Sequence, residues 1–265
     1  MSHSSRLRRR PGLPALMLFL AAGLPFLVAP ACQAAPLKTV DLYLPDAPPL
    51  SMPGPPIRGH GIVGDATLKA ATLTGLNLNL IALPWARAQL NVRAGKDQLI
   101  IPLSRTPDRE AHYTWIAPIM SMDRAFFSLA TRVDSFEQAR NTYQRIAVGM
   151  GSAQEQKLRD EGFTDEQIYP VKIGENPAQL LLLGRVDAWF NGIPESRYIW
   201  RGVSSRPLLM SPPLMTTDLY LACSKVCNES LVQRLRSAVS DLRNDGTLKR
   251  IADAYLGELS GSLAQ

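Results

Sequence analysis

The sequence predicts an α/β protein made of two similar units with a cleft between them. Short apolar runs alternate with amphipathic segments, which is the β-α-β pattern of a parallel-rich sheet covered by helices on both faces. This pattern begins again near Arg124, so we expect two lobes. Folds of this kind bind ligands where strand ends face each other, and we therefore expect a central cleft between the lobes.

In the first unit, the boundaries of the elements follow from turn and capping residues. Asp65 and Gly75 mark the start and the end of one helix, and Pro84 and Gly95 mark those of the next. Alternation of apolar and polar residues over 76–83 is typical of a strand. The expected order is strand 41–44, helix 64–75, strand 76–83, helix 84–95 and strands 97–104 and 111–118.

The second unit repeats this order, and two helices close the chain. Ser135 is a predicted helix cap, and the turn Gly149–Ser152 opens another helix. The expected elements are strand 124–132, helix 135–141, strand 145–150, helix 151–162, strand 166–173, helix 176–185, strand 186–192, helix 193–202, a mostly extended segment 205–225 and helices 228–246 and 247–257. Because we expect the last helices to return to the first unit, lobe 1 is residues 35–122 plus 213–265, and lobe 2 is residues 123–212.

The N-terminus has the pattern of a secretory signal peptide, residues 1–34. Basic residues 6–10 precede an apolar run that Pro14 and Pro25 interrupt, and small residues follow. We expect cleavage after Ala34 and a periplasmic location. A retained membrane anchor is disfavoured because a spanning helix needs about 20 unbroken apolar residues. A lipoprotein that begins at Cys32 is the weaker alternative.

Export changes the interpretation of the charge. The formal net charge is +6, but four arginines and no acid lie in the leader, which leaves 25 basic and 23 acidic residues, about +2. A basic stripe with interleaved aromatic residues is absent from the remaining sequence, so we expect no nucleic-acid partner. We expect a monomer that binds a small molecule.

Cysteine and histidine are rare. Cys223 and Cys227 follow each other closely, and in an oxidising compartment they form either a disulfide or two reduced thiols. His3, His60 and His112 lack the spacing of metal ligands, so we expect neither a metal ion nor another cofactor.

Several short motifs of this chain, and the order in which they follow one another, resemble those of the family 3 periplasmic solute-binding proteins, the receptors of polar amino-acid ABC transporters. These motifs are P-W at 84–85, A-G-K-D at 94–97, L-S-R-T-P-D-R-E at 103–110, V-G-M-G-S-A-Q-E at 148–155, G-R-V-D-A-W-F at 184–190 and D-G-T-L-K-R-I-A-D-A-Y-L-G at 245–257. The resemblance covers essentially the whole chain after the leader. It implies a two-lobed type II periplasmic-binding-protein fold.

The resemblance also implies a site for a carboxylate. In the T-x-x-R motif, Arg109 matches the arginine that grips the ligand's α-carboxylate, and a guanidinium is suited to this because it bonds a carboxylate with two parallel hydrogen bonds. Ser104 and Thr106 match positions that supply hydroxyl or backbone donors. Arg105, Asp108 and Glu110 are expected to be solvated or to brace Arg109.

Lobe 2 is expected to supply further ligand contacts. Gly151 and Ser152 match a turn whose N–H groups bind anions at a helix start, and Ser152 is also an ordinary cap. Trp85 either walls the pocket or lies in the core. Relatives that bind amino acids carry an acid for the α-ammonium where this chain has Asn191, and Glu195 is a substitute or an exposed acid of a helix. We therefore expect a carboxylate-bearing ligand, an amino acid or a related molecule.

Three functions fit these features. The first is a binding protein that closes on its ligand and delivers it to the permease complex of an ABC importer. The second is a dehydratase or lyase on the same scaffold, with Glu195 or Asp187 as general acid or base. The third is a sensory ligand receptor. Because the sequence has no Ser/His/Asp or Cys/His set, it does not favour hydrolysis, and binding is the preferred prediction.

Overall fold

The computed structural model describes residues 39–55, 57 and 59–260, with the side chains of 258–260 excepted. The predicted leader and Cys32 lie outside these residues. Within them, none of the helices is long and apolar enough to cross a membrane.

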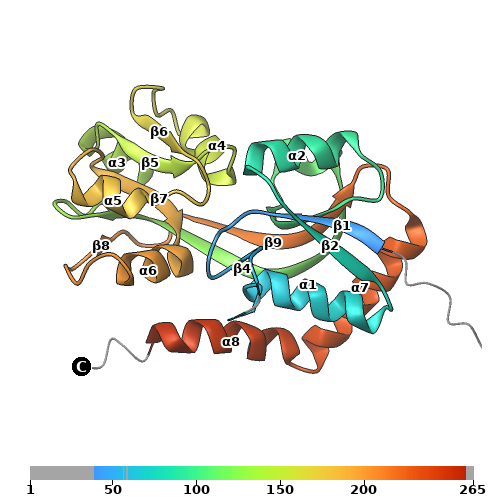
Figure 1. The fold of residues 1–265 in the computed structure, drawn as a ribbon. Coiled ribbons are helices and arrows are strands. Elements are labelled where there is room, and N and C mark those ends of the chain that lie inside the picture. Colours follow the sequence, from blue (N-terminus) through green and yellow to red (C-terminus); the bar gives the residue numbers. More distant parts are fainter. Residues whose placement is uncertain (1–38, 56, 58, 261–265) are drawn as a thin grey trace, which may run out of the picture. The chain divides into compact units, whose positions relative to one another are not determined.

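The described chain alternates strands and helices (Figure 1). The strands are β1 (Thr39–Leu44), β2 (Asn77–Ala82), β3 (Leu99–Ser104), β4 (Tyr113–Ser128), β5 (Ile146–Gly149), β6 (Ile168–Val171), β7 (Ala188–Gly192), β8 (Leu209–Met210) and β9 (Met215–Ser224). The helices are α1 (Ile62–Leu73), α2 (Trp85–Ala94), α3 (Phe136–Thr142), α4 (Ala153–Asp160), α5 (Pro177–Leu182), α6 (Ile193–Arg201), α7 (Glu229–Asn244) and α8 (Thr247–Ser260), with a 3₁₀ helix at Pro107–His112.

The strands form one mixed sheet in the order β2-β1-β3-β9-β4-β7-β5-β6, and β8 pairs with β4. Pairing is parallel at the two ends of the sheet, where β1 lies between β2 and β3 and β5 lies between β6 and β7. In the middle, β9 pairs antiparallel with β3 and β4, and β4 pairs antiparallel with β7. The expectation of a parallel-rich sheet is therefore wrong for the middle strands.

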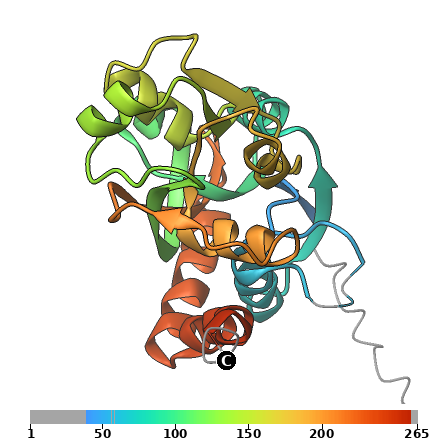
Figure 2. The ribbon, with the colours of Figure 1, turned by 90° about the vertical axis from the view of Figure 1, so that its left-hand side faces the viewer.

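We call β1–β3 with α1, α2, α7 and α8 the first half, and β5–β8 with α3–α6 the second half. Each half has a hydrophobic core on both faces of its sheet. Leu42 and Leu44 lie in one core of the first half while Tyr43 lies in the other, and Ile146 and Ala147 divide in the same way in the second half. This division follows from the alternation of side chains along a strand. Figure 2 shows the second half end-on, with α8 below α6.

The longest strand, β4, runs from the first half into the second. Residues 111–118 and 124–132 were predicted as two separate strands, and the structure instead has one strand over Tyr113–Ser128. Pro118 is paired with Tyr220 of β9, and the register shifts directly after it, so that Ile119 is left out of the ladder. Such an irregularity disrupts the ladder locally and is a place where a strand tolerates a proline.

A disulfide joins Cys223, near the end of β9, to Cys227, with a Cα–Cα distance of 6.2 Å. The sequence left this pairing open. Cys223 is fully buried in the core below α7, and Cys227 packs against the same core. The bond therefore ties the turn that leads into α7 to the edge of that core.

The closing helix α8 is fixed to the start of α1 by hydrogen bonds. The Tyr255 hydroxyl donates to Asp65 Oδ2 at 2.5 Å and accepts from the Gly61 N–H at 3.0 Å, and the other oxygen of Asp65 accepts from the His60 N–H. Gly61 has a φ of 85°, and a Cβ there would meet the backbone of Leu50. The local turn thus requires glycine, and the N–H of this buried glycine is satisfied by the tyrosine hydroxyl.

Replacing Tyr255 tests this connection. Tyr255→Phe leaves the Gly61 N–H and Asp65 without their shared partner, so we expect a loss of about 1–2 kcal/mol in the free energy of unfolding, measured by urea denaturation. Tyr169→Phe is the control, since it keeps the ring over which Arg145 lies. Equal stabilities of the two variants would show that the hydroxyl of Tyr255 contributes nothing.

Candidate ligand-binding site

The charged segment 105–110 contains one buried arginine and three exposed charged residues. It folds as a 3₁₀ helix that begins at Pro107. Arg105 forms an ion pair with Glu110, with an Nη2–Oε1 distance of 2.5 Å, and its guanidinium lies over the rings of Trp115 and Tyr220. Asp108 is exposed as well. Arg109 alone turns inward, and only 5% of it is exposed.

Arg109 connects the two halves. Its Nη1 donates to the Ser104 carbonyl oxygen at 3.3 Å, and its Nη2 donates to the Gly151 carbonyl oxygen of the second half at 3.0 Å. Burial lowers the pKa of Arg109, while Asp108, 3.9 Å away, partly offsets that effect. A guanidinium starts from such a high pKa that it stays protonated at neutral pH even so.

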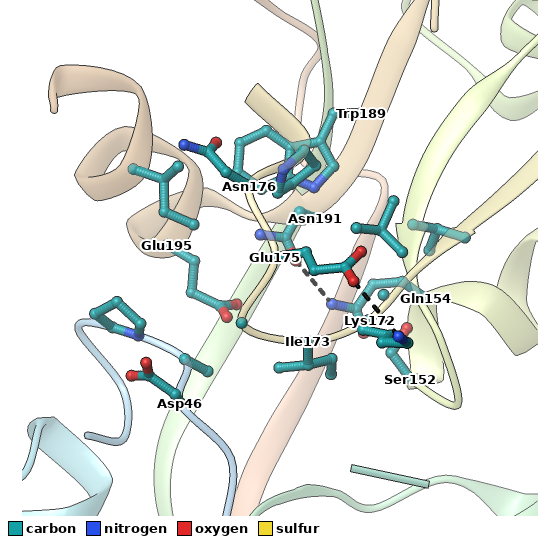
Figure 3. A pocket seen from close by; sticks show the side chains of 18 residues that line it. Asp46, Ser152, Gln154, Lys172, Ile173, Glu175, Asn176, Trp189, Asn191 and Glu195 are labelled. Carbon is teal, nitrogen blue, oxygen red and sulfur yellow. Dashed lines mark hydrogen bonds and ion pairs between the residues drawn. The ribbon is translucent and has the colours of Figure 1, made fainter. Parts of the chain in front are cut away.

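Two adjoining cavities lie between the halves. The larger has a volume of about 210 Å³ and the smaller about 50 Å³, and both are lined by Ala47, Ser152, Gln154, Ile173 and Glu195. We call them the large and the small cavity. Arg109 lines the small cavity, as do Ser104, Trp85 and Arg124. The large cavity has mainly apolar walls, with polar groups from Asp46, Lys172, Glu175 and Asn191 (Figure 3).

The structure brings most of the predicted site residues to these cavities. Trp85 is buried in the core beneath β3 and also lines the small cavity. Asn191 is buried in the large cavity, where its Oδ1 accepts from Gln154 at 3.2 Å (Figure 3). Thr106 lies outside the residues that line either cavity, and its buried hydroxyl has no partner among the described residues.

The turn at Gly151 contributes in a different way from that expected. Its φ is 70°, a left-handed conformation that favours glycine, and its carbonyl oxygen accepts from Arg109. The N–H of Gly151 donates to Glu155, and the N–H of Ser152 donates to the Gly149 carbonyl oxygen. These two N–H groups, predicted to bind an anion, are therefore engaged within the turn. Ser152 caps α4 by accepting from the Glu155 N–H, as its ordinary role predicts.

Glu195 lies in the first turn of α6 and lines both cavities. Figure 3 shows its side chain reaching from α6 toward the loop that carries Asp46. Burial raises the pKa of Glu195 to about 7, and the positive charge of Arg124 opposes this shift. The other proposed acid or base, Asp187, lines neither the large nor the small cavity, and its carboxylate accepts from the N–H groups of Gln144 and Arg145. Of the two, only Glu195 faces the cleft.

Sequence reasoning missed Arg124, Gln154 and Trp189. Arg124 is 2% exposed, but in the sequence it follows Asp123, and an adjacent pair of opposite charges does not indicate burial. Gln154 and Trp189 lie in motifs that the sequence did reveal, but no pattern indicated that they face the cleft. Within the described part of the chain, His, Cys, Asp and Glu form no group of three that could hold a metal ion.

A family model covers nearly the entire described chain. The model for bacterial extracellular solute-binding proteins, family 3, matches residues 42–258. The chain belongs to this family. The match confirms the family that the sequence motifs predicted. A comparison with curated proteins gave no match.

Solved structures confirm the predicted two-lobed fold. A histidine kinase sensor domain with similarity to periplasmic binding proteins has a TM-score of 0.75 at 16% identity, covering 83% of this chain and 97% of its own. The arginine-, lysine-, histidine-binding protein ArtJ from Geobacillus stearothermophilus has a TM-score of 0.73 at 15% identity, covering 83% and 96%. The ancestral amino acid-binding protein AncCDT-1, a precursor of cyclohexadienyl dehydratase, has a TM-score of 0.70 at 18% identity, covering 82% and 95%.

The pKa of Glu195 gives a test of the site. Its ordinary value is 4.5 and its folded value about 7, so the folded state holds more protons between these values and loses stability as the pH rises through them. Glu195→Gln cannot titrate. We expect the variant to match the unmodified protein at about pH 4, below the ordinary pKa, and to exceed it by about 1–3 kcal/mol at pH 8, measured by urea unfolding.

The exposed acid of α3 provides the control, since Glu137→Gln should leave the pH dependence of stability unchanged. Parallel stability curves for the unmodified protein and Glu195→Gln would mean that Glu195 is ionised with an ordinary pKa.

Proposed function

We propose that this protein is an exported receptor that captures a small carboxylate-bearing molecule between two lobes and passes it to the permease complex of an ABC importer. In this proposal, lobe 1 is residues 35–122 plus 213–265 and lobe 2 is residues 123–212. The observation that carries it is the buried guanidinium of Arg109 in the wall of the small cavity. Family membership supports solute binding, and the carboxylate, the lobes and the importer are our additions.

The carboxylate follows from the chemistry of Arg109. Burial removes water from the guanidinium, and this loss of hydration lowers the pKa of Arg109. Only a nearby anion or several hydrogen bonds can replace the lost hydration. Two carbonyl oxygens meet part of that need, and the nearest carboxylate, on Asp108, lies 3.9 Å from Nε with half of its side chain exposed. A ligand carboxylate in the small cavity would supply charge-assisted hydrogen bonds at a position where water screens them little.

The remainder of the ligand would occupy the large cavity. Trp189, Ile173 and Ile199 form apolar walls there, while Glu195 lies at the boundary with the small cavity. Asn191, at the position where related amino-acid receptors carry an acid, is neutral. We therefore propose that Glu195 accepts the ligand's ammonium or another hydrogen-bond donor, as a carboxylate above its pKa of about 7.

A second candidate function is a dehydratase or lyase, and the pKa of Glu195 favours it specifically. A general acid works best when its pKa is close to the operating pH, and Glu195 meets that condition while facing the cleft. Analysis of the bound molecule distinguishes the two functions. A receptor returns its ligand unchanged, whereas an enzyme converts it, and conversion would disappear in Glu195→Gln.

The partner is the remaining alternative. A permease and an ATPase encoded beside this protein would favour import, and a signalling receptor in that position would favour a sensory role.

Arg109→Ala tests the proposed function. L-glutamate, L-glutamine and L-arginine are suitable probes, each paired with its α-amide, because the amide removes only the carboxylate charge. We expect a probe that binds the unmodified protein to bind Arg109→Ala roughly 100-fold more weakly by isothermal titration calorimetry, since charge-assisted hydrogen bonds are lost. The α-amides should bind both proteins weakly.

Arg105→Ala is the matched control, because Arg105 belongs to the same charged segment but lies on the surface. It should retain affinity, and both variants should unfold with the cooperativity of the unmodified protein. Equal affinity of Arg109→Ala and Arg105→Ala would remove Arg109 from the site.

A further inference from the structure

Arg124 occupies the last pair of the β4–β9 ladder, opposite Met215, and is 2% exposed. Its Nη1 donates to the Met122 carbonyl oxygen at 3.1 Å and to Thr217 Oγ1 at 2.8 Å. Its Nη2 donates to Ser104 Oγ at 2.8 Å. One guanidinium thus connects the two strands that pass between the halves to a residue in the wall of the small cavity.

The bond to Ser104 determines what the serine can do. A hydroxyl has one proton to donate and two lone pairs that accept. Since Ser104 accepts from Arg124, its proton remains available to a group in the small cavity, which Ser104 lines. The Ser104 carbonyl oxygen is occupied by Arg109. Arg109 therefore binds the carbonyl oxygen of Ser104 while Arg124 binds its hydroxyl oxygen, and the hydroxyl proton is free to be donated to an anion.

The same guanidinium interacts electrostatically with Glu195, since Arg124 pairs in the sheet with Gly192, which immediately precedes α6. Arg124 and Glu195 both line the small cavity, and each stabilises the charged form of the other. Burial lowers the pKa of Arg124 to about 10, with Glu195 opposing the shift and Arg109 adding to it. The other charged groups that face Glu195 across the two cavities are Asp46, Lys172, Glu175 and Arg109. Lys172 and Glu175 are 3.8 Å apart and partly cancel each other.

We propose that Arg124 is a positioning residue of the ligand site, which aims the Ser104 hydroxyl at the anion bound by Arg109 and pairs electrostatically with Glu195. Both terminal nitrogens of Arg124 donate to protein acceptors, its buried Nε has no partner among the described residues, and in this proposal it acts through Ser104 and Glu195. Ligands that present an anion to Ser104 and a hydrogen-bond donor to Glu195 are selected by this arrangement. The inference rests on the proposed function, although the electrostatic pairing of Arg124 with Glu195 can be tested without a ligand.

The ligand-free experiment measures the ionisation of Glu195. The side-chain carboxyl of Glu195 is followed by NMR in protein labelled with ¹³C-glutamate and is assigned by its loss in Glu195→Gln. Because Arg124 favours the charged carboxylate, Arg124→Gln should raise the titration midpoint by about one pH unit. Arg124→Lys keeps the charge and should leave the midpoint close to that of the unmodified protein. An unchanged midpoint in Arg124→Gln would overturn the proposed electrostatic pairing of Arg124 with Glu195.

The ligand experiment uses the same three amino acids and compares Ser104→Ala, Arg124→Lys and the double variant. Lysine cannot hold three acceptors in the planar geometry of a guanidinium, so Arg124→Lys should weaken binding about tenfold, as Ser104→Ala does. If Arg124 acts through Ser104, the double variant should be no weaker than either single variant. Additive losses, or full affinity in Arg124→Lys, overturn the positioning role.

These outcomes separate the inference from the function on which it rests. Failure of all three amino acids to bind the unmodified protein counts against the proposed ligand class. The Glu195 titration still decides whether Arg124 pairs electrostatically with Glu195. If Arg124→Gln does not fold, Thr217→Val removes one anchor of Arg124 without removing its charge. It should then weaken binding with little change in the midpoint, and full affinity in this variant would count against the proposal.

Discussion

The antiparallel ladder between β4 and β9 is the constraint on which the site depends. It runs from Tyr113 opposite Ser224 to Arg124 opposite Met215, and so passes from the first half into the second. The neighbouring ladders place Ser104 beside β9, through its pairing with Leu219, and Asn191 beside β4. Backbone pairing fixes these positions far more narrowly than side-chain packing does. Ser104, Arg124 and Asn191 are thus carried on β3, β4 and β7 of one sheet.

The cleft holds more buried positive than negative charge. Arg109 and Arg124 are both buried, and Arg109 disfavours the charged form of Arg124. Glu195, an acid of the same cleft, is itself kept from ionising easily by burial. Desolvating two cations is costly unless an anion or good acceptors compensate. The protein provides carbonyl and hydroxyl oxygens, which carry only partial charge. An anionic ligand would provide the full charge, and this difference is a physical source of affinity.

The sequence predicted the parts of the site that a motif marks, and it failed where long-range pairing decides. The T-x-x-R pattern identified Arg109, and the turn before α4 identified Ser152, because each belongs to a local stretch with its own geometry. Arg124 has no motif: its importance arises from Ser104 and Thr217, which lie 20 and 93 residues away in sequence. Likewise, local sequence could not show that Pro118 lies at an irregularity inside one long strand, since β9 creates that strand.

Asn191 presents a neutral group to the cleft. Its amide is bonded to Gln154 and is neutral at every pH, so in the proposed function the carboxylate that meets a donor group is that of Glu195 on the next helix. The N-terminal end of a helix normally favours a charged acid, yet burial dominates here and raises the pKa to about 7. A buried aspartate held by several donors would stay ionised in acid. Glu195 instead gains its charge near neutral pH. If Glu195 meets a cationic group of the ligand as proposed, binding of that group strengthens as the pH rises through that value.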